Sequence, residues 1–119
     1  MHRLAIALVV LFCATSAAHA FRGECVLQVK GVSYIKGPCD ITTEKSGDFE
    51  VSTLKGQRLY FAQVSHEDDG TTNGFWNGTV PGADHAHAHL GILTQQGGCW
   101  VNDQAKICAW RPGTQKPLL

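Results

Sequence analysis

The sequence lacks an apolar run long enough to cross a membrane as a helix, and it lacks an excess of either charge. Its longest apolar stretch, Leu4 to Ala14, is shorter than the roughly 20 residues that a bilayer-spanning helix needs. Ten Lys and Arg residues balance ten Asp and Glu residues, so the formal net charge is zero. We therefore expect neither nucleic acid nor, after removal of the N-terminal segment, a membrane as a partner.

The sequence also lacks the motifs that mark common enzymes. It has no nucleophilic serine in a glycine-flanked elbow, no phosphate-binding loop and no H-E-x-x-H helix. We therefore do not expect an enzyme. The remaining enzymatic hypothesis is a small hydrolase whose site is assembled from distant residues, such as His66 with Asp84 or Asp103.

Residues 1–20 have the three parts of a cleavable secretory signal. A short basic start precedes the apolar run, and Ala18 and Ala20 fit the small-x-small pattern before a cleavage site. The bulky Phe12 before Cys13 argues against a lipid anchor at that cysteine. We therefore expect cleavage after Ala20 and a periplasmic or secreted protein.

Cleavage would leave four cysteines, namely Cys25, Cys39, Cys99 and Cys108. An even set of cysteines in an oxidising compartment indicates disulfides, which removes these thiols as nucleophiles, and three pairings are open from the sequence alone. We expect the local pairs Cys25–Cys39 and Cys99–Cys108. Cys99 and Cys108 are equidistant from the centre of the last predicted turn, so they should lie opposite one another in a hairpin.

The first pair depends on a predicted hairpin. Lys30-Gly31 is typical of a two-residue turn, because glycine accepts the positive φ that such a turn requires. In this register Leu27 faces Tyr34, and Gly37-Pro38 then brings Cys39 back towards its partner.

The rest of the chain consists of short apolar runs separated by Gly, Asn, Asp and Pro, without a long helical period. This pattern predicts an all-β fold, a small antiparallel barrel or sandwich of about seven short strands stapled by two disulfides. We expect one domain over residues 21–111 and a loose tail over 112–119. The predicted strands are 25–29, 32–36, 49–54, 58–64, 90–94, 99–101 and 106–110, with a turn over 95–98 and a brief further strand at 75–76.

Three segments carry a resemblance to small exported proteins of proteobacteria that have no assigned function. They are the stretch from Cys25 to Gly37-Pro38-Cys39, Tyr60-Phe61-Ala62, and the ending Gly98-Cys99-Trp100-Val101-Asn102 with Lys106-Ile107-Cys108-Ala109-Trp110. The resemblance covers most of the chain after the signal. It implies a Gram-negative periplasmic or secreted setting, and it implies no activity, substrate or site residue.

The segment Asp84-His85-Ala86-His87-Ala88-His89 holds three of the six histidines. As a strand, it would place His85, His87 and His89 on one face, where neighbouring rings lie about 6.5–7 Å apart and could share one ion. As a helical turn, it would pair His85 with His89 instead. Zinc, copper or nickel would be the cofactor, because imidazole is a common ligand of these ions.

A metal site here needs a further ligand, for which His66, Glu67, Asp68 and Asp69 are candidates. The alternative interpretation is a solvated strand face or loop in which the histidines bind nothing. A transition-metal-binding protein is therefore our second functional hypothesis.

The first functional hypothesis concerns residues 65–82, which are rich in turn-forming residues and are expected to form one long loop. Phe75 and Trp76 within it could contact a partner, although Trp76 could equally fill one end of the core. The motif Asn77-Gly78-Thr79 matches a glycosylation acceptor, and we interpret it as a turn. We expect a non-enzymatic binding module, an inhibitor or a protective protein, that contacts an unknown protein or small ligand.

Overall fold

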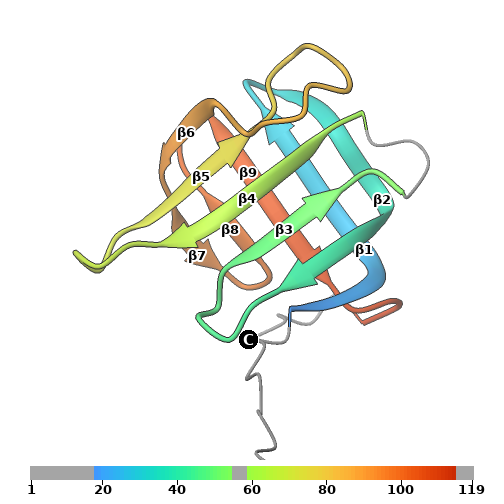
Figure 1. Ribbon diagram of the computed structural model, residues 1–119, viewed down its shortest axis with the longest axis horizontal. Helices are drawn as coiled ribbons and strands as arrows, with labels where there is room; N and C mark the ends of the chain where they lie inside the picture. The colour runs from blue at the N-terminus through green and yellow to red at the C-terminus, as the bar shows by residue number, and fades with distance from the viewer. Residues whose placement is uncertain (1–17, 55–58, 115–119) are drawn as a thin grey trace, which may run out of the picture.

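The computed structural model describes residues 18–54 and 59–114, and these residues form one all-β domain (Figure 1). The described part contains no helix, and so no helix in it could cross a membrane. The predicted fold class is confirmed. The strands are β1 His19–Val29, β2 Val32–Thr43, β3 Phe49–Ser52, β4 Phe61–His66, β5 Thr72–Trp76, β6 Ala88–Ile92, β7 Thr94–Gln96, β8 Cys99–Val101 and β9 Ala105–Trp110.

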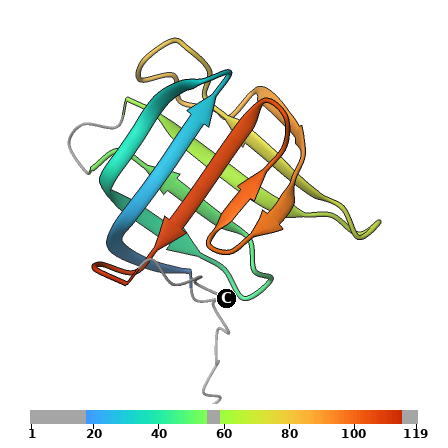
Figure 2. The same cartoon turned by 180° about the vertical axis from the view of Figure 1, so that it is seen from behind.

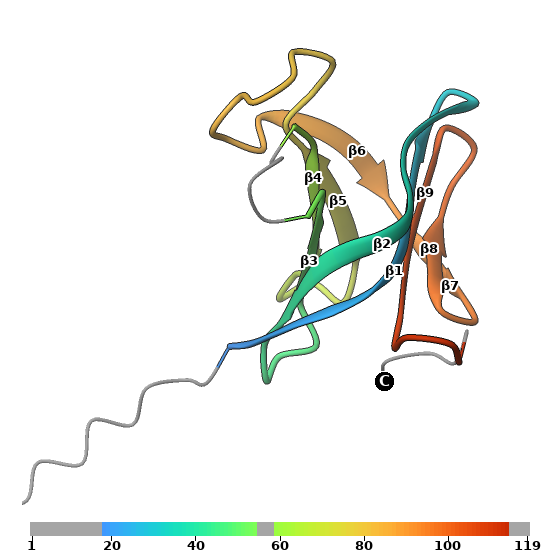
Figure 3. The same cartoon turned by 90° about the vertical axis from the view of Figure 1, so that its right-hand side faces the viewer.

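All nine strands belong to one antiparallel sheet, in the order β6-β5-β4-β3-β2-β1-β9-β8-β7. The sheet curls into two facing layers, with β3 to β6 on one side and β9, β8 and β7 on the other (Figure 3). The long strands β1 and β2 bend and run through both layers. Seen from behind, β1, β9 and β8 cross in front of β3 to β5 (Figure 2).

The two end strands of this order, β6 and β7, are consecutive in the chain and are separated only by Leu93. The backbone N–H of Leu93 donates to the carbonyl of Thr72, 2.8 Å away. The side-chain amides of Asn102 and Gln104, in the β8–β9 turn, donate to the carbonyl of Leu90 in β6 at 2.9 and 2.8 Å. These side-chain bonds tie β6 to the β8–β9 turn on the other side of the sheet, which makes the sheet a nearly closed barrel.

The core lies inside the barrel and follows the period-two alternation of the strands. In β1, Cys25, Leu27 and Val29 are buried while the residues between them are half-exposed, as the sequence predicted. The opposite walls approach closely at Gly74 of β5. A Cβ there would lie 2.8 Å from Leu93 Cδ1, which is too close for a real contact.

The predicted Lys30-Gly31 turn is confirmed, and both residues have positive φ, 50° and 80°. The predicted pairing of Leu27 with Tyr34 is wrong, because Leu27 pairs with Ile35, whereas Val29 pairs with Val32 next to the turn as this register requires. A β-bulge leaves Tyr34 without a cross-strand partner in β1. Bulges increase local twist and redirect side chains, and this bulge accompanies the packing of Tyr34 against the core.

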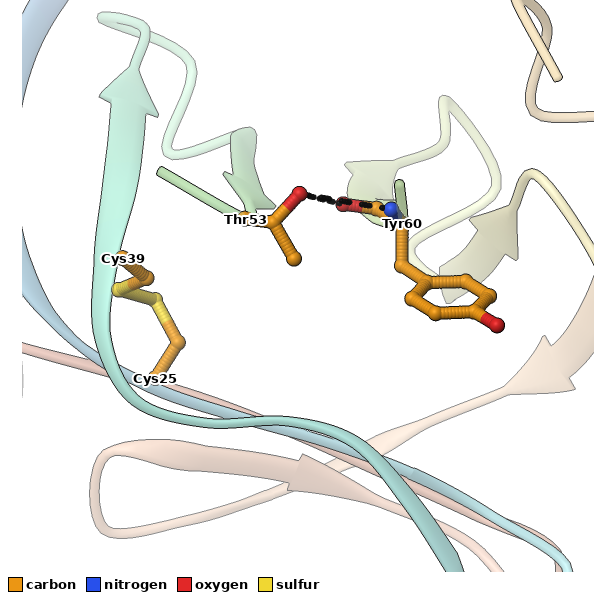
Figure 4. The surroundings of a disulfide bond; sticks show 4 residues. All are labelled: Cys25, Cys39, Thr53 and Tyr60. Atoms are coloured by element: carbon orange, nitrogen blue, oxygen red, sulfur yellow. Dashed lines mark hydrogen bonds between the residues drawn. A yellow bond between two sulfur atoms is a disulfide. The ribbon is translucent and has the colours of Figure 1, made fainter. Parts of the chain in front are cut away.

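Both predicted disulfides are present. Cys99 and Cys108 lie directly opposite one another in β8 and β9, with Cα atoms 4.0 Å apart. Cys25 and Cys39 are diagonal neighbours on β1 and β2, with Cα atoms 5.8 Å apart (Figure 4). Disulfides persist in oxidising compartments, so the pair indicates an extracellular or periplasmic environment.

The structure has nine strands where about seven were predicted. A short strand, β7, occupies part of the expected 95–98 turn, and β5 occupies the middle of the expected 65–82 loop. The sequence of β5 opens with Thr72-Asn73-Gly74, which resembles a turn locally. It forms a strand because β4 and β6 pair with it on either side, and Gly74 leaves room for the side chain of Leu93 inside the barrel.

The predicted chain ends are described only in part. Most of the predicted signal lies outside the described residues, whereas His19 and Ala20 form the start of β1 opposite Thr43 and Thr42. Cleavage after Ala20 would therefore remove the first two residues of this strand. Of the predicted tail, the described residues up to Thr114 are exposed beyond the end of β9.

Candidate functional site at the 77–87 loop

The most prominent connection in the described chain is the 77–87 loop, which joins β5 to β6 and projects from one end of the barrel (Figures 1 and 3). The expected single loop over 65–82 does not exist. Its first part is the tight turn between β4 and β5, at the other end of these strands. Only residues 77–82 of that range belong to the projecting loop.

Asn77 holds the base of the loop and is 6% exposed. Its Oδ1 accepts from the backbone N–H of Phe61 at 3.0 Å, and its Nδ2 donates to the carbonyls of Leu59 at 2.9 Å and Ala83 at 3.2 Å. The amide thus ties both limbs of the loop to the start of β4. Because the amide nitrogen is engaged and buried, the Asn77-Gly78-Thr79 motif is unsuited to glycosylation in the folded protein.

The tip of the loop is a turn from Val80 to Ala83, closed by a 3.3 Å bond from the Ala83 N–H to the Val80 carbonyl. Pro81 followed by Gly82, whose φ is 78°, fits a type II turn. The Gly82 N–H donates to the carbonyl of Leu59 at 2.9 Å. The tip is therefore bonded to the body of the domain.

Two large apolar side chains are exposed where the tip meets the body. Val80 is 68% exposed and Leu59 is 48% exposed. The backbone of Leu59 is fixed by a hydrogen bond, because its N–H donates to Thr53 Oγ1 at 2.9 Å. The same hydroxyl contacts the backbone of Tyr60 (Figure 4).

An aromatic cluster supports this end of the barrel. The Tyr34 ring centre lies 5.0 Å from that of Tyr60 and 4.7 Å from that of Trp76. Trp76 is only 5% exposed and belongs to the core, which agrees with the core-filling interpretation of this residue. It is therefore unsuited to be a contact residue, and it serves as the rigid base from which the loop starts.

Phe75, the other predicted contact residue, lies on the opposite face of β5 from Trp76. Its ring stacks on that of His89 with centres 4.9 Å apart and planes at 23°. His89 Nε2 lies 2.9 Å from Asn73 Oδ1. Phe75 and His89 thus form a patch on the outer wall of the barrel, separate from the tip of the loop.

The three clustered histidines divide into two groups. His85 and His87 lie in the loop, in neither the strand nor the helical turn that the sequence suggested, and their ring centres are 5.2 Å apart. His89 lies in β6 and contacts Asn73 and Phe75. Across residues 18–54 and 59–114, no three His, Cys, Asp or Glu side chains lie close enough together to hold an ion jointly.

His66 is not joined to this cluster. Its Nδ1 lies 2.7 Å from Thr72 Oγ1. Its ring and that of Trp100 pack edge to face, with ring centres 5.2 Å apart. Its backbone N–H, not its ring, bonds to a carboxylate, that of Asp48, at 2.8 Å. Within the described residues its ring contacts neither Asp84 nor Asp103.

A threonine beside a histidine resembles part of a hydrolytic site, but the surroundings of Thr72 do not favour catalysis. Thr72 is 7% exposed, so a substrate would have little access to its hydroxyl. The nearby carboxylate of Asp48 is bonded to the backbone of His66 and does not orient the ring. The geometry therefore gives no support to the hydrolase hypothesis.

The acidic turn between β4 and β5 is bonded within itself. Asp69 Oδ1 accepts from the Thr71 hydroxyl at 2.6 Å and from the Thr71 N–H at 2.9 Å. These two bonds lower the pKa of the Asp69 carboxyl below its ordinary value, and the bond from the hydroxyl has the larger effect. Gly70, with φ of 87°, permits the tight reversal.

Comparison of the chain with protein-family models, curated proteins and solved structures found no match.

Proposed function

We propose that this protein is an exported, non-enzymatic binding module that contacts a partner protein through the tip of the 77–87 loop. Export rests on the predicted signal over residues 1–20, with cleavage after Ala20 and release to the periplasm or beyond. The two disulfides are consistent with that destination.

The observation that carries the proposal is a pre-organised loop with exposed apolar side chains at its tip. Asn77 joins both limbs, and the Gly82 N–H bonds the tip to Leu59. A loop held in this way loses little conformational entropy on binding, which improves affinity without additional contacts. Pre-organised loops of this kind are typical of protein inhibitors.

The chemistry of the tip indicates the partner surface. Val80 and Leu59 are exposed and apolar, and Pro81 between Val80 and Gly82 adds a rigid ring. A shallow apolar pocket on a protein would accommodate such a tip. Phe75 does not belong to this contact, because it lies on the outer wall of β5 against His89.

Site-specific photo-crosslinking tests the proposal. A photoreactive amino acid at position 80, in protein exported to the periplasm, should give one discrete adduct. The substitution Leu59→Ser should remove the adduct. It should leave the melting temperature close to that of the wild type, because Leu59 is exposed. The matched control carries the photoreactive group at position 92, because Ile92 is similarly exposed, at 60%, but lies on β6.

An adduct at position 80 that depends on Leu59 and is absent at position 92 would support the loop as a contact surface. Equal labelling at positions 80 and 92, or an adduct that Leu59→Ser leaves unchanged, would overturn the proposal.

A further inference from the structure

The 77–87 loop carries a second feature that the proposed partner contact does not use, the pair of His85 and His87. Their ring centres are 5.2 Å apart and their planes are tilted by 55°. We infer that these two imidazoles form a binding site for a divalent transition-metal ion of the copper, nickel and zinc group, with water completing the coordination.

The separation of the rings suits a shared ion. An imidazole nitrogen lies about 2.0–2.1 Å from zinc, which places the ring centre about 3.2 Å from the ion. Two rings with centres 5.2 Å apart would then subtend about 110° at the ion, close to the tetrahedral angle that zinc adopts. The distance between the ring centres is thus compatible with one shared ion.

Both rings are available for this role. His85 and His87 are exposed, and among residues 18–54 and 59–114 neither ring has a hydrogen-bond partner. In contrast, His89 is bonded to Asn73 and stacked on Phe75, and His66 is bonded to Thr72. The structure therefore distinguishes this pair from His66 and His89.

The ligand set also indicates which ions bind. Imidazole nitrogen favours copper, nickel and zinc, whereas magnesium and calcium require oxygen ligands. For a nitrogen site without imposed geometry, affinity follows the order copper above nickel and zinc. No third His, Cys, Asp or Glu side chain joins the pair in the described residues, so two or more positions remain open to water.

Metal titration of the purified, untagged protein tests this inference. Zinc, nickel and copper(II) should each bind with a stoichiometry of one, and magnesium should not bind. His85→Ala and His87→Ala should each lower the affinity for zinc by about tenfold or more, since each removes one of two protein ligands. The matched control is His89→Ala, which should retain the wild-type affinity.

Proton NMR of the imidazole rings locates the ion directly. Zinc should shift or broaden the ring signals of His85 and His87 and leave those of His66 and His89 unchanged. Wild-type affinity in His85→Ala would overturn the inference. An equal loss in His89→Ala would also overturn it, because the ion would then be held by the whole histidine cluster and not by this pair.

The titration is independent of the proposed partner contact. It is carried out without a partner, and the crosslinking at position 80 can be carried out in the presence of a chelator. Failure of one experiment therefore leaves the other interpretable. Both histidines are exposed, so circular dichroism of the two alanine variants should show the wild-type fold.

Discussion

The Nδ2 atom of Asn102 lies 2.9 Å from the carbonyl oxygen of Leu90, and this contact joins the β8–β9 turn to β6, one end strand of the nine-stranded sheet. The same amide also reaches the carbonyl of Ile92 at 3.1 Å. Gln104 adds a second donor to Leu90. We call the meeting of β6 with the β8–β9 turn the seam. Side-chain amides supply hydrogen bonds across it, because β6 and the described strands of the other layer form no backbone ladder.

Removal of the Asn102 amide should weaken the seam. Asn102→Ala loses two donated bonds and the two that Oδ1 accepts from the N–H groups of Gln104 and Ala105. We expect the free energy of unfolding to fall by about 2–6 kcal/mol, because each of the four lost bonds contributes about 0.5–1.5 kcal/mol. Urea unfolding measures the change, and hydrogen exchange should accelerate in β6.

The matched control for the seam is Gln95→Ala. Within the part of the chain that the structure describes, the amide of Gln95, on the exposed strand β7, bonds only to the carbonyl of Gly97, 3.3 Å away. The substitution Gln95→Ala should change the free energy of unfolding by no more than about 0.5 kcal/mol. Similar midpoints of urea unfolding for Asn102→Ala and Gln95→Ala would show that the Asn102 amide does not stabilise the seam.

Substitution of Asn77 should release the 77–87 loop. Asn77→Ala removes one accepted and two donated hydrogen bonds at a buried site. We expect the free energy of unfolding to fall by about 2–4 kcal/mol. Thr79→Ala also destroys the Asn77-Gly78-Thr79 motif but lies at an exposed position, so its stability should be nearly that of the wild type. Thermal and urea unfolding of both variants compare the two effects, and equal stabilities would contradict the anchoring role.

Loss of either disulfide should destabilise the domain. The two bonds close loops with sequence separations of 14 and 9, for which chain entropy predicts a contribution of about 2.5–3 kcal/mol each. A double alanine variant of each pair, studied by urea unfolding, measures the loss. A non-reducing peptide map should recover Cys25 with Cys39 and Cys99 with Cys108, and any other pairing would refute the connectivity.

The turn between β4 and β5 should respond to pH through Asp69. Its carboxylate form is the one that Thr71 bonds, so its pKa is lower in the folded protein than in the unfolded chain. The resulting stabilisation is present above the ordinary aspartate pKa and is lost as the pH falls through the lower, folded value.

NMR titration of the Asp69 side-chain carboxyl measures this pKa. Thr71→Val removes the hydroxyl, the larger cause of the shift, and should raise the pKa towards its ordinary value. Thr71→Ser keeps a hydroxyl and should retain the lowered pKa. An identical pKa in the valine variant would mean that the hydroxyl bond is absent in solution.

Several features of this fold were predictable because they depend on neighbours along the chain. The Lys30-Gly31 turn follows from the φ values that glycine permits, and the alternation of Cys25, Leu27 and Val29 specifies the buried face of β1. Disulfide pairing was predictable for the same reason, since each pair brackets one hairpin. The secretory signal remains a prediction.

The candidate site was predictable only in part. The turn-forming residues between Asn77 and Ala83 indicated an exposed loop, but they did not reveal that Asn77 would be buried. The exposed partner of the tip, Leu59, lies on a different strand connection. Nothing in the local sequence links it to Val80.

The sequence by itself determined the β class and the Lys30-Gly31 turn and favoured the two local disulfide pairs, because period-two alternation and turn chemistry act over a few residues. Only the tertiary structure decided the closure of the barrel, the bulge at Tyr34 and the strand at Thr72–Trp76. It also separated His89 from His85 and His87, by placing His89 against Phe75. Each of these features depends on groups distant in sequence, such as Asn102 and Leu90, that meet only when the sheet curls.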